Sequence, residues 1–426
     1  MKIGLFGNSV NVFYMIGKML RKIHLDTQLV LDTLQTDPMH NPVWYDLDFE
    51  LPYDMLNSRP SYEKFLDKQR QQAGWEMPDW VIGYEKAKLS TSIITALNHF
   101  EMMKHAMGSF FKCKNKGAIL VLKEAIKNST RLVGYDCVLA TAMGPFNAYL
   151  ANVPCIMWVT GGDVYELPFR TNDADSLFRA RAKFQRTGLL HSKFILSYFY
   201  ILEFLKRLNI SDKYRFWCFP IDAETFKPLN VEADQLLDSK LIEKIRGRLL
   251  FYSPSRFQYG YKGNQKILHA FARFCRKYNA FLITHAWGED WEKAKLLANQ
   301  LGIEDSVYFH LAVLSKQRLA KFYNLADVIV DHFNIPAFGG VSTEAMSCGR
   351  PLLTYMDMKR LSDFIPEEPP IFAAHTEEEI YNKMVEATDT GRREELGKQA
   401  RKWVTRYHGF DNINTLLNFM KESMKE

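Results

Sequence analysis

Short apolar, β-branched runs alternate along the chain with longer stretches in which apolar residues recur at helical spacing. The runs predict strands and the longer stretches predict amphipathic helices. The expected strands are Lys2–Phe6, Thr27–Leu31, Val133–Ala140, Cys155–Val159, Phe194–Ser197, Arg248–Ser253, Ala280–Thr284, Val307–Phe309, Ala326–Asp331 and Pro351–Tyr355. Strict alternation of strand and helix in the second half predicts a parallel sheet with right-handed crossovers. The opening strand, glycine turn, helix and strand predict a second such domain, so the expected fold class is α/β with two Rossmann-like, doubly wound domains.

A boundary between these domains is expected at Phe219–Pro228, where two prolines flank a polar turn. The 426 residues are enough for two domains that each bury a core. From about Asp46 to Asn128 the pattern is helical and irregular, and prolines interrupt it.

Two loops in the first half follow expected strands. Gly7 lies in the turn after the first strand, where it either shapes a turn or borders a ligand site. Thr160–Asp163 joins two glycines to an acid directly after another strand. Because open α/β sheets bind ligands outside the carboxyl ends of their strands, Asp163 is a candidate site residue.

A cationic loop, Ser255–Gly263, follows the strand that ends at Ser253. Its guanidinium, on Arg256, suits a forked contact with a diphosphate, and its ammonium, on Lys262, suits a point-charge contact. The alternative is that both are solvated surface charges.

The stretch Asn324–Tyr355 reads as strand, glycine loop, helix and strand, with a helix expected at Val341–Ser347. Paired glycines allow close backbone approach, and the amides of a first helical turn attract an anion. The expected phosphate donors lie at Gly339, Gly340, Val341 and Ser342. Glu344, one turn into the helix, can accept hydrogen bonds from a ribose. The alternative is a tight loop with Glu344 as a partner of the helix dipole.

The segment FGGVSTEAMSCGRPLL resembles the C-terminal signature of the family-four retaining glycosyltransferases, which carry E-G-F-G-x-x-x-x-E-A-x-A-x-G-x-P-V-I. The positions in register are Phe338, Gly339, Glu344, Ala345, Gly349 and Pro351. The cationic loop is similar to the family's G-R-L-x-x-x-K-G, Thr160–Asp163 to its H-G-S-D, and Phe219–Pro228 to its N-G-V-D-x-x-x-F-x-P. The resemblance is continuous from about Leu249 to His408 and absent from about Asp46 to Asn128.

The resemblance implies the GT-B architecture, with an acceptor-binding domain at 1–221, a sugar-nucleotide-binding domain at 222–409 and a last helix, 410–426, that packs back on the first domain. It implies transfer of a sugar to a glycan or lipid-linked glycan with retention of configuration, as in polysaccharide biosynthesis. Arg256 and Lys262 would stabilise the leaving diphosphate without a metal, and Asp163 would join them as a catalytic residue. No cofactor is implied, because the nucleotide-sugar is a substrate.

One position departs from the family pattern: Pro336 occupies the place of the first glutamate in the family's E-x7-E motif. Asp331, His332 and Asn334 are the nearest polar groups that could contact the donor sugar instead. The alternative is that they satisfy backbone groups of the loop. The departure also keeps two other functions open, a sugar-nucleotide-binding protein without activity and a nucleotide-sugar epimerase of the same fold.

The net charge of +6 fits a phosphorylated substrate or an anionic membrane, whereas the scattered Lys and Arg do not predict nucleic-acid binding. Thr91–Lys116 has the pattern of a basic amphipathic helix, which either lies on a membrane or packs its apolar face on a core. The six cysteines show no C-x-x-C spacing, which indicates free thiols in a reducing compartment. No signal peptide or apolar span is evident. The expected location is therefore the cytoplasm or the inner face of the membrane.

Overall fold

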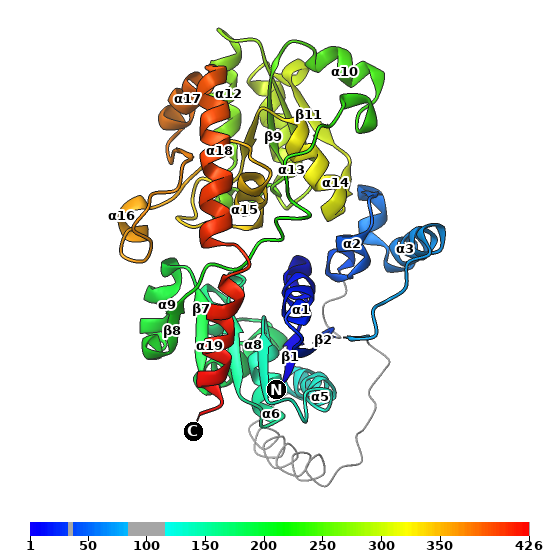
Figure 1. Ribbon diagram of the computed structural model, residues 1–426, viewed down its shortest axis with the longest axis vertical. Helices are drawn as coiled ribbons and strands as arrows, with labels where there is room; N and C mark the ends of the chain where they lie inside the picture. The colour runs from blue at the N-terminus through cyan, green and yellow to red at the C-terminus, as the bar shows by residue number, and fades with distance from the viewer. Residues whose placement is uncertain (33–36, 84–115, 426) are drawn as a thin grey trace. The chain divides into compact units, whose positions relative to one another are not determined.

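The computed structural model describes residues 1–32, 37–83 and 116–425, which form two compact units (Figure 1). Unit 1 contains Met1–Tyr45, Gly74–Phe219 and Asp411–Glu426, and unit 2 contains Asp46–Ala73 and Pro220–Phe410. Most of the stretch Thr91–Lys116, which the sequence predicts as a basic amphipathic helix, lies outside the described residues.

Unit 1 is built on a seven-stranded parallel sheet in the order β4-β2-β1-β5-β6-β7-β8. Its strands are β1 (Lys2–Phe6), β2 (Asp26–Val30), β4 (Val81–Ile82), β5 (Cys137–Ala140), β6 (Cys155–Trp158), β7 (Phe194–Ser197) and β8 (Tyr214–Phe216). Its helices are α1 (Val12–Lys22), α2 (Val43–Asp46), α5 (Lys116–Ser129), α6 (Gly144–Leu150), α7 (Gly162–Tyr165), α8 (Ser176–His191), α9 (Leu202–Arg207) and α19 (Asn412–Ser423). The central strands are apolar and fully buried, as strands covered by helices on both faces must be.

Unit 2 is built on a six-stranded parallel sheet in the order β11-β10-β9-β13-β14-β15. Its strands are β9 (Leu249–Ser253), β10 (Ala280–His285), β11 (Val307–His310), β13 (Val328–Val330), β14 (Leu352–Thr354) and β15 (Phe372–Ala373). Its main helices are α10 (Ser239–Ile245), α11 (Tyr259–Lys262), α12 (Gln265–Cys275), α13 (Trp291–Gln300), α14 (Lys316–Leu325), α15 (Gly340–Ser347), α16 (Met358–Leu361), α17 (Glu377–Glu386) and α18 (Thr390–Tyr407). Helices α12, α13, α17 and α18 contribute buried residues to one core that covers the face of Phe251 and Leu282. Tyr252, which points to the opposite face, packs against Phe322 of α14.

The two parallel sheets confirm the predicted fold class. The order of each sheet reverses once, between β1 and β5 in unit 1 and between β9 and β13 in unit 2. Such a reversal is where open α/β sheets form a crevice for a ligand, outside the carboxyl ends of the strands.

The division of the chain differs from the expected one at residues 46–73, which pack with unit 2 although the prediction placed all of 1–221 in the first domain. This segment, which we call the arm, contains β3 (Glu50–Pro52) and α3 (Arg59–Ala73). Strand β3 pairs antiparallel with β12 (Ala312–Leu314) of unit 2. The prediction missed this pairing because strands so far apart in sequence leave no local signal.

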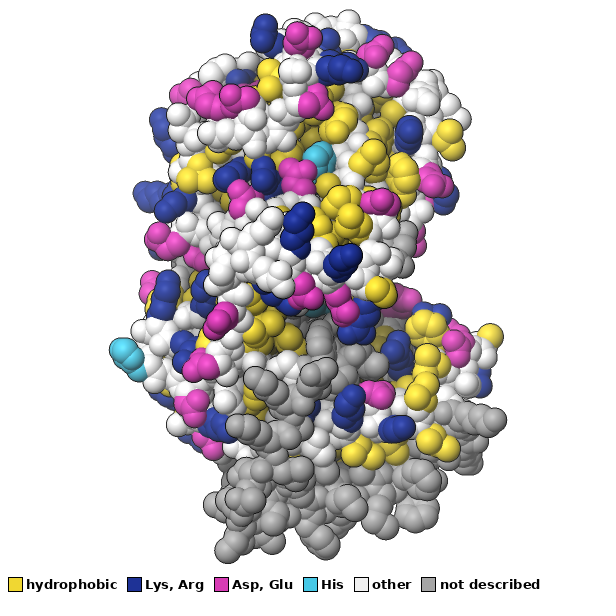
Figure 2. All heavy atoms as spheres, turned by 90° about the vertical axis from the view of Figure 1, so that its right-hand side faces the viewer, with side chains coloured by type: hydrophobic (Ala, Val, Ile, Leu, Met, Phe, Trp, Pro, Cys, Tyr) yellow, Lys and Arg dark blue, Asp and Glu magenta, His cyan; other side chains and the backbone are white. Residues whose placement is uncertain are grey.

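Charges of both signs are interspersed over the described residues of the face shown in Figure 2. Across the described parts of the chain, no helix combines the length and the apolar character needed to cross a membrane.

Candidate functional site

Asp331 links the two strands at the reversal in unit 2. It directly follows β13 and is 1% exposed. One carboxylate oxygen accepts a hydrogen bond from Oγ of Ser255, after β9, at 2.6 Å, and the other accepts one from Oγ of Ser342, in α15, at 2.7 Å. Nζ of Lys262 lies 3.6 Å from the first of these oxygens. The Asp331 carboxylate thus connects Ser255, which follows β9, with helix α11 and the first turn of α15.

The charge of Asp331 is stabilised by these neighbours. Burial alone would raise the pKa of Asp331, but His332, Lys262 and the hydroxyl of Ser255 more than offset that effect, so the pKa lies well below its ordinary value. A buried carboxylate that stays charged can fix several loops at once, because a charged acceptor makes stronger hydrogen bonds than a neutral one.

The first turn of α15 reaches solvent at Gly340, which is exposed, whereas Gly339 and Val341 are half-buried and Ser342 is buried. Gly339 is the N-cap residue and makes no side-chain cap, and its carbonyl accepts from the amide of Thr343 at 3.2 Å. The amides of Gly340, Val341 and Ser342 precede this first helical hydrogen bond, so they are the donors that an α-helix leaves without an intrahelical acceptor. They are three of the four groups that the sequence predicts as phosphate donors; the fourth is Gly339, the N-cap residue.

Neither glycine of this turn is required by its own backbone. Gly339 has a φ of −104°, and neither it nor Gly340 lies in the left-handed region. A Cβ added at Gly340 would meet only an Oε1 atom of Glu344, at 3.7 Å, and one at Gly339 would meet nothing closer than 3.8 Å. These are ordinary contact distances, so the protein itself tolerates side chains here. The glycines instead leave the helix end uncovered.

Glu344 is 5% exposed and is held by two side chains from α14. Lys316 forms an ion pair with Oε1, and the hydroxyl of Tyr323 donates to Oε2 at 2.9 Å. Each carboxylate oxygen has a second lone pair, so it can still accept from a ligand. Lys316 and Tyr323 are functional candidates that the sequence did not reveal, because a buried lysine looks like a solvated one in the sequence pattern.

The two predicted cations of the segment Ser255–Gly263, which follows β9, differ in environment. Lys262 is 18% exposed and donates to Oγ of Ser255 at 3.3 Å. Arg256 has an exposed side chain that makes no ion pair with a described residue, while its carbonyl accepts from the side chain of Asn264 at 2.9 Å. Lys262, at the end of α11, is therefore held by its neighbours, whereas Arg256 is exposed. The contact of both cations with a diphosphate stays a prediction.

His332 and Asn334 brace the loop between β13 and α15. Nε2 of the buried His332 ring lies 2.7 Å from the carbonyl oxygen of Ala337. The amide group of Asn334 donates to two backbone carbonyls of α11 at 3.3 Å and accepts from Lys266 at 2.7 Å. These contacts favour the alternative in which both residues satisfy groups of the loop.

Gly7 and Asp163, the other predicted site residues, belong to unit 1. Gly7 has a φ of 83°, which favours glycine, and its amide donates to Val30 of the neighbouring strand at 3.0 Å. The Asp163 carboxylate accepts from the amide of Gly161 at 2.8 Å and from the hydroxyl of Thr160 at 3.0 Å. Burial raises the pKa of Asp163, and these hydrogen bonds oppose the rise. Asp163 therefore braces its own loop, and its catalytic role stays a prediction.

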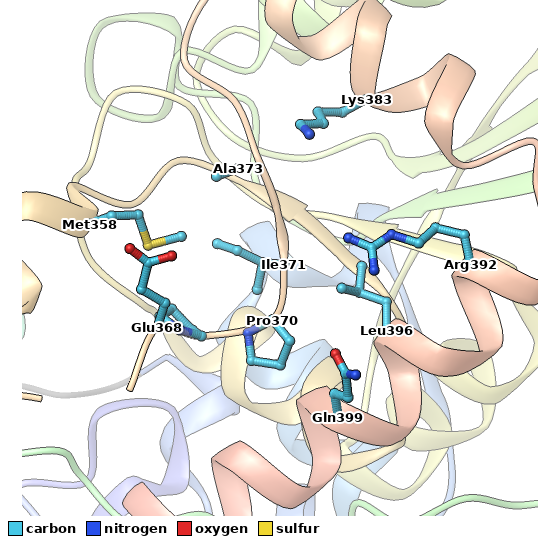
Figure 3. A pocket seen from close by; sticks show the side chains of 10 residues that line it. Met358, Glu368, Pro370, Ile371, Ala373, Lys383, Arg392, Leu396 and Gln399 are labelled. Carbon is cyan, nitrogen blue, oxygen red and sulfur yellow. The ribbon is translucent and has the colours of Figure 1, made fainter. Parts of the chain in front are cut away.

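A pocket of about 370 Å³ lies elsewhere in unit 2, between the 368–371 loop and helices α17 and α18 (Figure 3). None of the predicted site residues lines it. Its two cations, Lys383 and Arg392, both pair with Glu386, at 2.6 and 3.1 Å, so one carboxylate already offsets part of their charge.

Two comparisons of the sequence with known proteins match part of the chain. Residues 238–403 match the family model described as glycosyl transferases group 1. An uncharacterized glycosyltransferase of Methanocaldococcus jannaschii is 27% identical over 168 residues, which are 39% of this chain and 42% of that protein. The match therefore spans less than half of the relative's length.

Solved structures of similar fold cover the whole chain. Sucrose-phosphate synthase from Thermosynechococcus elongatus is 16% identical, covers 100% of this chain and 99% of its own, and has a TM-score of 0.61. Anabaena HepE in complex with UDP-glucose is 14% identical, covers 99% of this chain and 100% of its own, and has a TM-score of 0.59. At these identities the likeness shows the fold.

The protein therefore has the GT-B fold, with two Rossmann-like units. Within unit 2, residues 238–403 are similar to the glycosyl transferases group 1 family.

Proposed function

We propose that the protein transfers a sugar from a nucleotide-sugar donor to a glycan or lipid-linked glycan acceptor, with retention of configuration and without a metal. The observation that carries the proposal is the open first turn of α15 beside Lys262, at the reversal between β9 and β13. An uncovered helix N-terminus with a positioned cation is suited to a diphosphate.

In this proposal the donor diphosphate lies against the amides of Gly340, Val341 and Ser342. Lys262 faces it from α11, and the exposed Arg256 reaches it with its guanidinium. These groups stabilise the negative charge that develops on the leaving nucleoside diphosphate, which lowers the barrier directly. Glu344 accepts from the ribose hydroxyls with the lone pairs that Lys316 and Tyr323 leave unused.

The donor sugar is recognised without the family glutamate, because Pro336 supplies neither a side-chain acceptor nor an N–H. His332 and Asn334 are committed to the loop, which leaves groups outside this loop to contact the sugar. The structure of Anabaena HepE, which has a similar fold, is a complex with UDP-glucose. UDP-sugars are therefore the first donors to test.

Two assays in sequence test the proposal. Thermal denaturation with a panel of sugar nucleotides finds the donor, since a ligand at 100 times its dissociation constant adds about 2.7 kcal/mol to stability. The donor is then supplied with its sugar radiolabelled, together with glycan and lipid-linked acceptors. We expect release of nucleoside diphosphate and a larger labelled product.

The other functions give different results in the same assays. An epimerase would convert the donor to an isomeric sugar nucleotide, and a binding protein would be stabilised without turnover. Absence of stabilisation by every sugar nucleotide would contradict the proposal itself. Flotation with anionic vesicles at low salt tests the membrane-bound acceptor, since electrostatic attraction is screened least there.

A further inference from the structure

The arm, residues 46–73, is joined to unit 2 by backbone pairing. Strand β3 pairs antiparallel with β12, with Leu51 opposite Val313, and Leu51 is fully buried. The pairing continues one step further, because the amide of Tyr53 donates to the carbonyl of Leu311 at 2.9 Å. The arm therefore supplies a strand that β12 would otherwise lack.

The pairing extends in the other direction to the start of α14. Ser315, which is fully buried, exchanges two hydrogen bonds with Phe49: its hydroxyl accepts from the Phe49 amide at 3.0 Å, and its amide donates to the Phe49 carbonyl at 3.1 Å. The same hydroxyl accepts from the amide of Arg318 at 3.3 Å, as the N-cap of α14. The arm thus fixes the residue at which this helix begins.

The next residue, Lys316, connects the arm to the candidate site. Its side chain is 10% exposed, and its ammonium forms the ion pair with Glu344. The ammonium also lies 5.8 Å from the ring of Phe226. A buried lysine held by its helix start and by one carboxylate has little freedom, so its placement decides the direction of the Glu344 oxygens.

We propose that Lys316 is a positioning residue for nucleotide binding and that the arm, through Phe49 and Ser315, sets its place. The proposal rests on the function proposed above, since Glu344 is there the ribose acceptor. Lys316 offsets the charge of Glu344 and holds one of its oxygens. Tyr323 holds the other. The remaining lone pairs are then directed toward the open end of α15.

The test measures the dissociation constant of UDP, GDP, ADP and dTDP by calorimetry, and follows the best binder. Lys316→Met removes the ammonium and keeps the apolar stem. We expect its dissociation constant for that nucleotide to rise about tenfold, the size of one lost charged contact. Lys295→Met, at an exposed lysine of α13 outside the arm and α14, is the matched control. Its binding should stay within about twofold of the wild type, because a solvated surface charge contributes little.

A second comparison separates positioning from general damage. If Lys316 acts through Glu344, the double variant Lys316→Met with Glu344→Gln should bind no more weakly than Glu344→Gln alone. The double variant also carries no unpaired buried charge, which favours folding where Lys316→Met alone fails. Additive losses would overturn the positioning role.

The arm's part is tested at Ser315. Ser315→Ala removes the acceptor of the Phe49 amide and should weaken nucleotide binding about threefold to tenfold, the range of one lost hydrogen bond. Ser315→Thr keeps the hydroxyl and should bind like the wild type. Equal binding by wild type, Ser315→Ala and Lys316→Met would overturn this inference and leave the proposed function standing. Failure of the wild type to bind any nucleotide would overturn both.

Discussion

Replacing Gly340 with alanine separates ligand binding from folding at the first turn of α15. The added methyl group would have one neighbour in the protein, Oε1 of Glu344 at 3.7 Å, which is an ordinary contact. Alanine is also favoured over glycine inside a helix by up to about 1 kcal/mol. The free energy of unfolding should therefore stay the same or rise by up to about 1 kcal/mol.

Nucleotide binding should respond in the opposite direction. Because the Cα–Cβ bond of a helical residue is tilted toward the helix N-terminus, we expect the methyl group to displace phosphate oxygens from the amides proposed to bind them. Loss of one such charged hydrogen bond corresponds to about 1.5–3 kcal/mol, or roughly tenfold to a hundredfold in the dissociation constant.

The matched control is Gly391→Ala, in the first turn of α18, where the added Cβ would lie 3.4 Å from a carboxylate oxygen of Asp389. Calorimetric titration with the nucleotide and urea denaturation of each variant give the two quantities. The control should bind like the wild type. Gly340→Ala that binds nucleotide as tightly as the wild type would refute the assignment of these amides.

Three further results are expected. Asp331→Asn should lower the free energy of unfolding by about 3 kcal/mol, because the buried carboxylate is bound by two hydroxyls and a lysine. Asp305→Asn, at a 96% exposed carboxylate, should change the urea midpoint little. Equal effects of the two substitutions would contradict the linking role of Asp331. Arg256→Ala should lower kcat/KM without loss of folding, by an amount that corresponds to about 2 kcal/mol or more of lost transition-state stabilisation. A folded variant with wild-type kcat/KM would remove Arg256 from the site. Burial lowers the pKa of His285 from 6.5 to about 3, so the unfolded state binds the proton first as the pH falls. The stability present above pH 6.5 is therefore lost as the pH falls toward 3. Urea midpoints from pH 7 to pH 4 should fall more steeply for the wild type than for His285→Gln, and equal slopes would contradict this.

Features that depend on local pattern could be predicted from the sequence. The helix expected at Val341–Ser347 begins one residue earlier, at Gly340, and the strand expected at Lys2–Phe6 has those bounds. Asp331 could be named as a candidate because a polar residue directly after a buried strand must lie at the sheet edge.

Features that depend on contacts between distant segments could not be predicted. The pairing of Leu51 with Val313 joins two segments of unit 2 between which most of unit 1 lies in the sequence, and nothing near either residue signals the other. The partner of Glu344 is a similar case: Lys316 begins an amphipathic helix, where a lysine is usually solvated, and only the tertiary structure buries it. The ion pair between Glu344 and Lys316 could therefore be identified only from the structure.

Hydrogen exchange of peptides that cover residues 338–346 tests whether the donor phosphate binds at the start of α15. The full chain is compared with and without the sugar nucleotide that stabilises it most. We expect slower exchange at the amides of Gly340, Val341 and Ser342, because the donor phosphate accepts their hydrogen bonds. The nucleoside diphosphate alone should slow exchange at the same amides. Saturating ligand that leaves exchange in these peptides unchanged, while it slows exchange elsewhere, would contradict the placement of the donor at the start of α15.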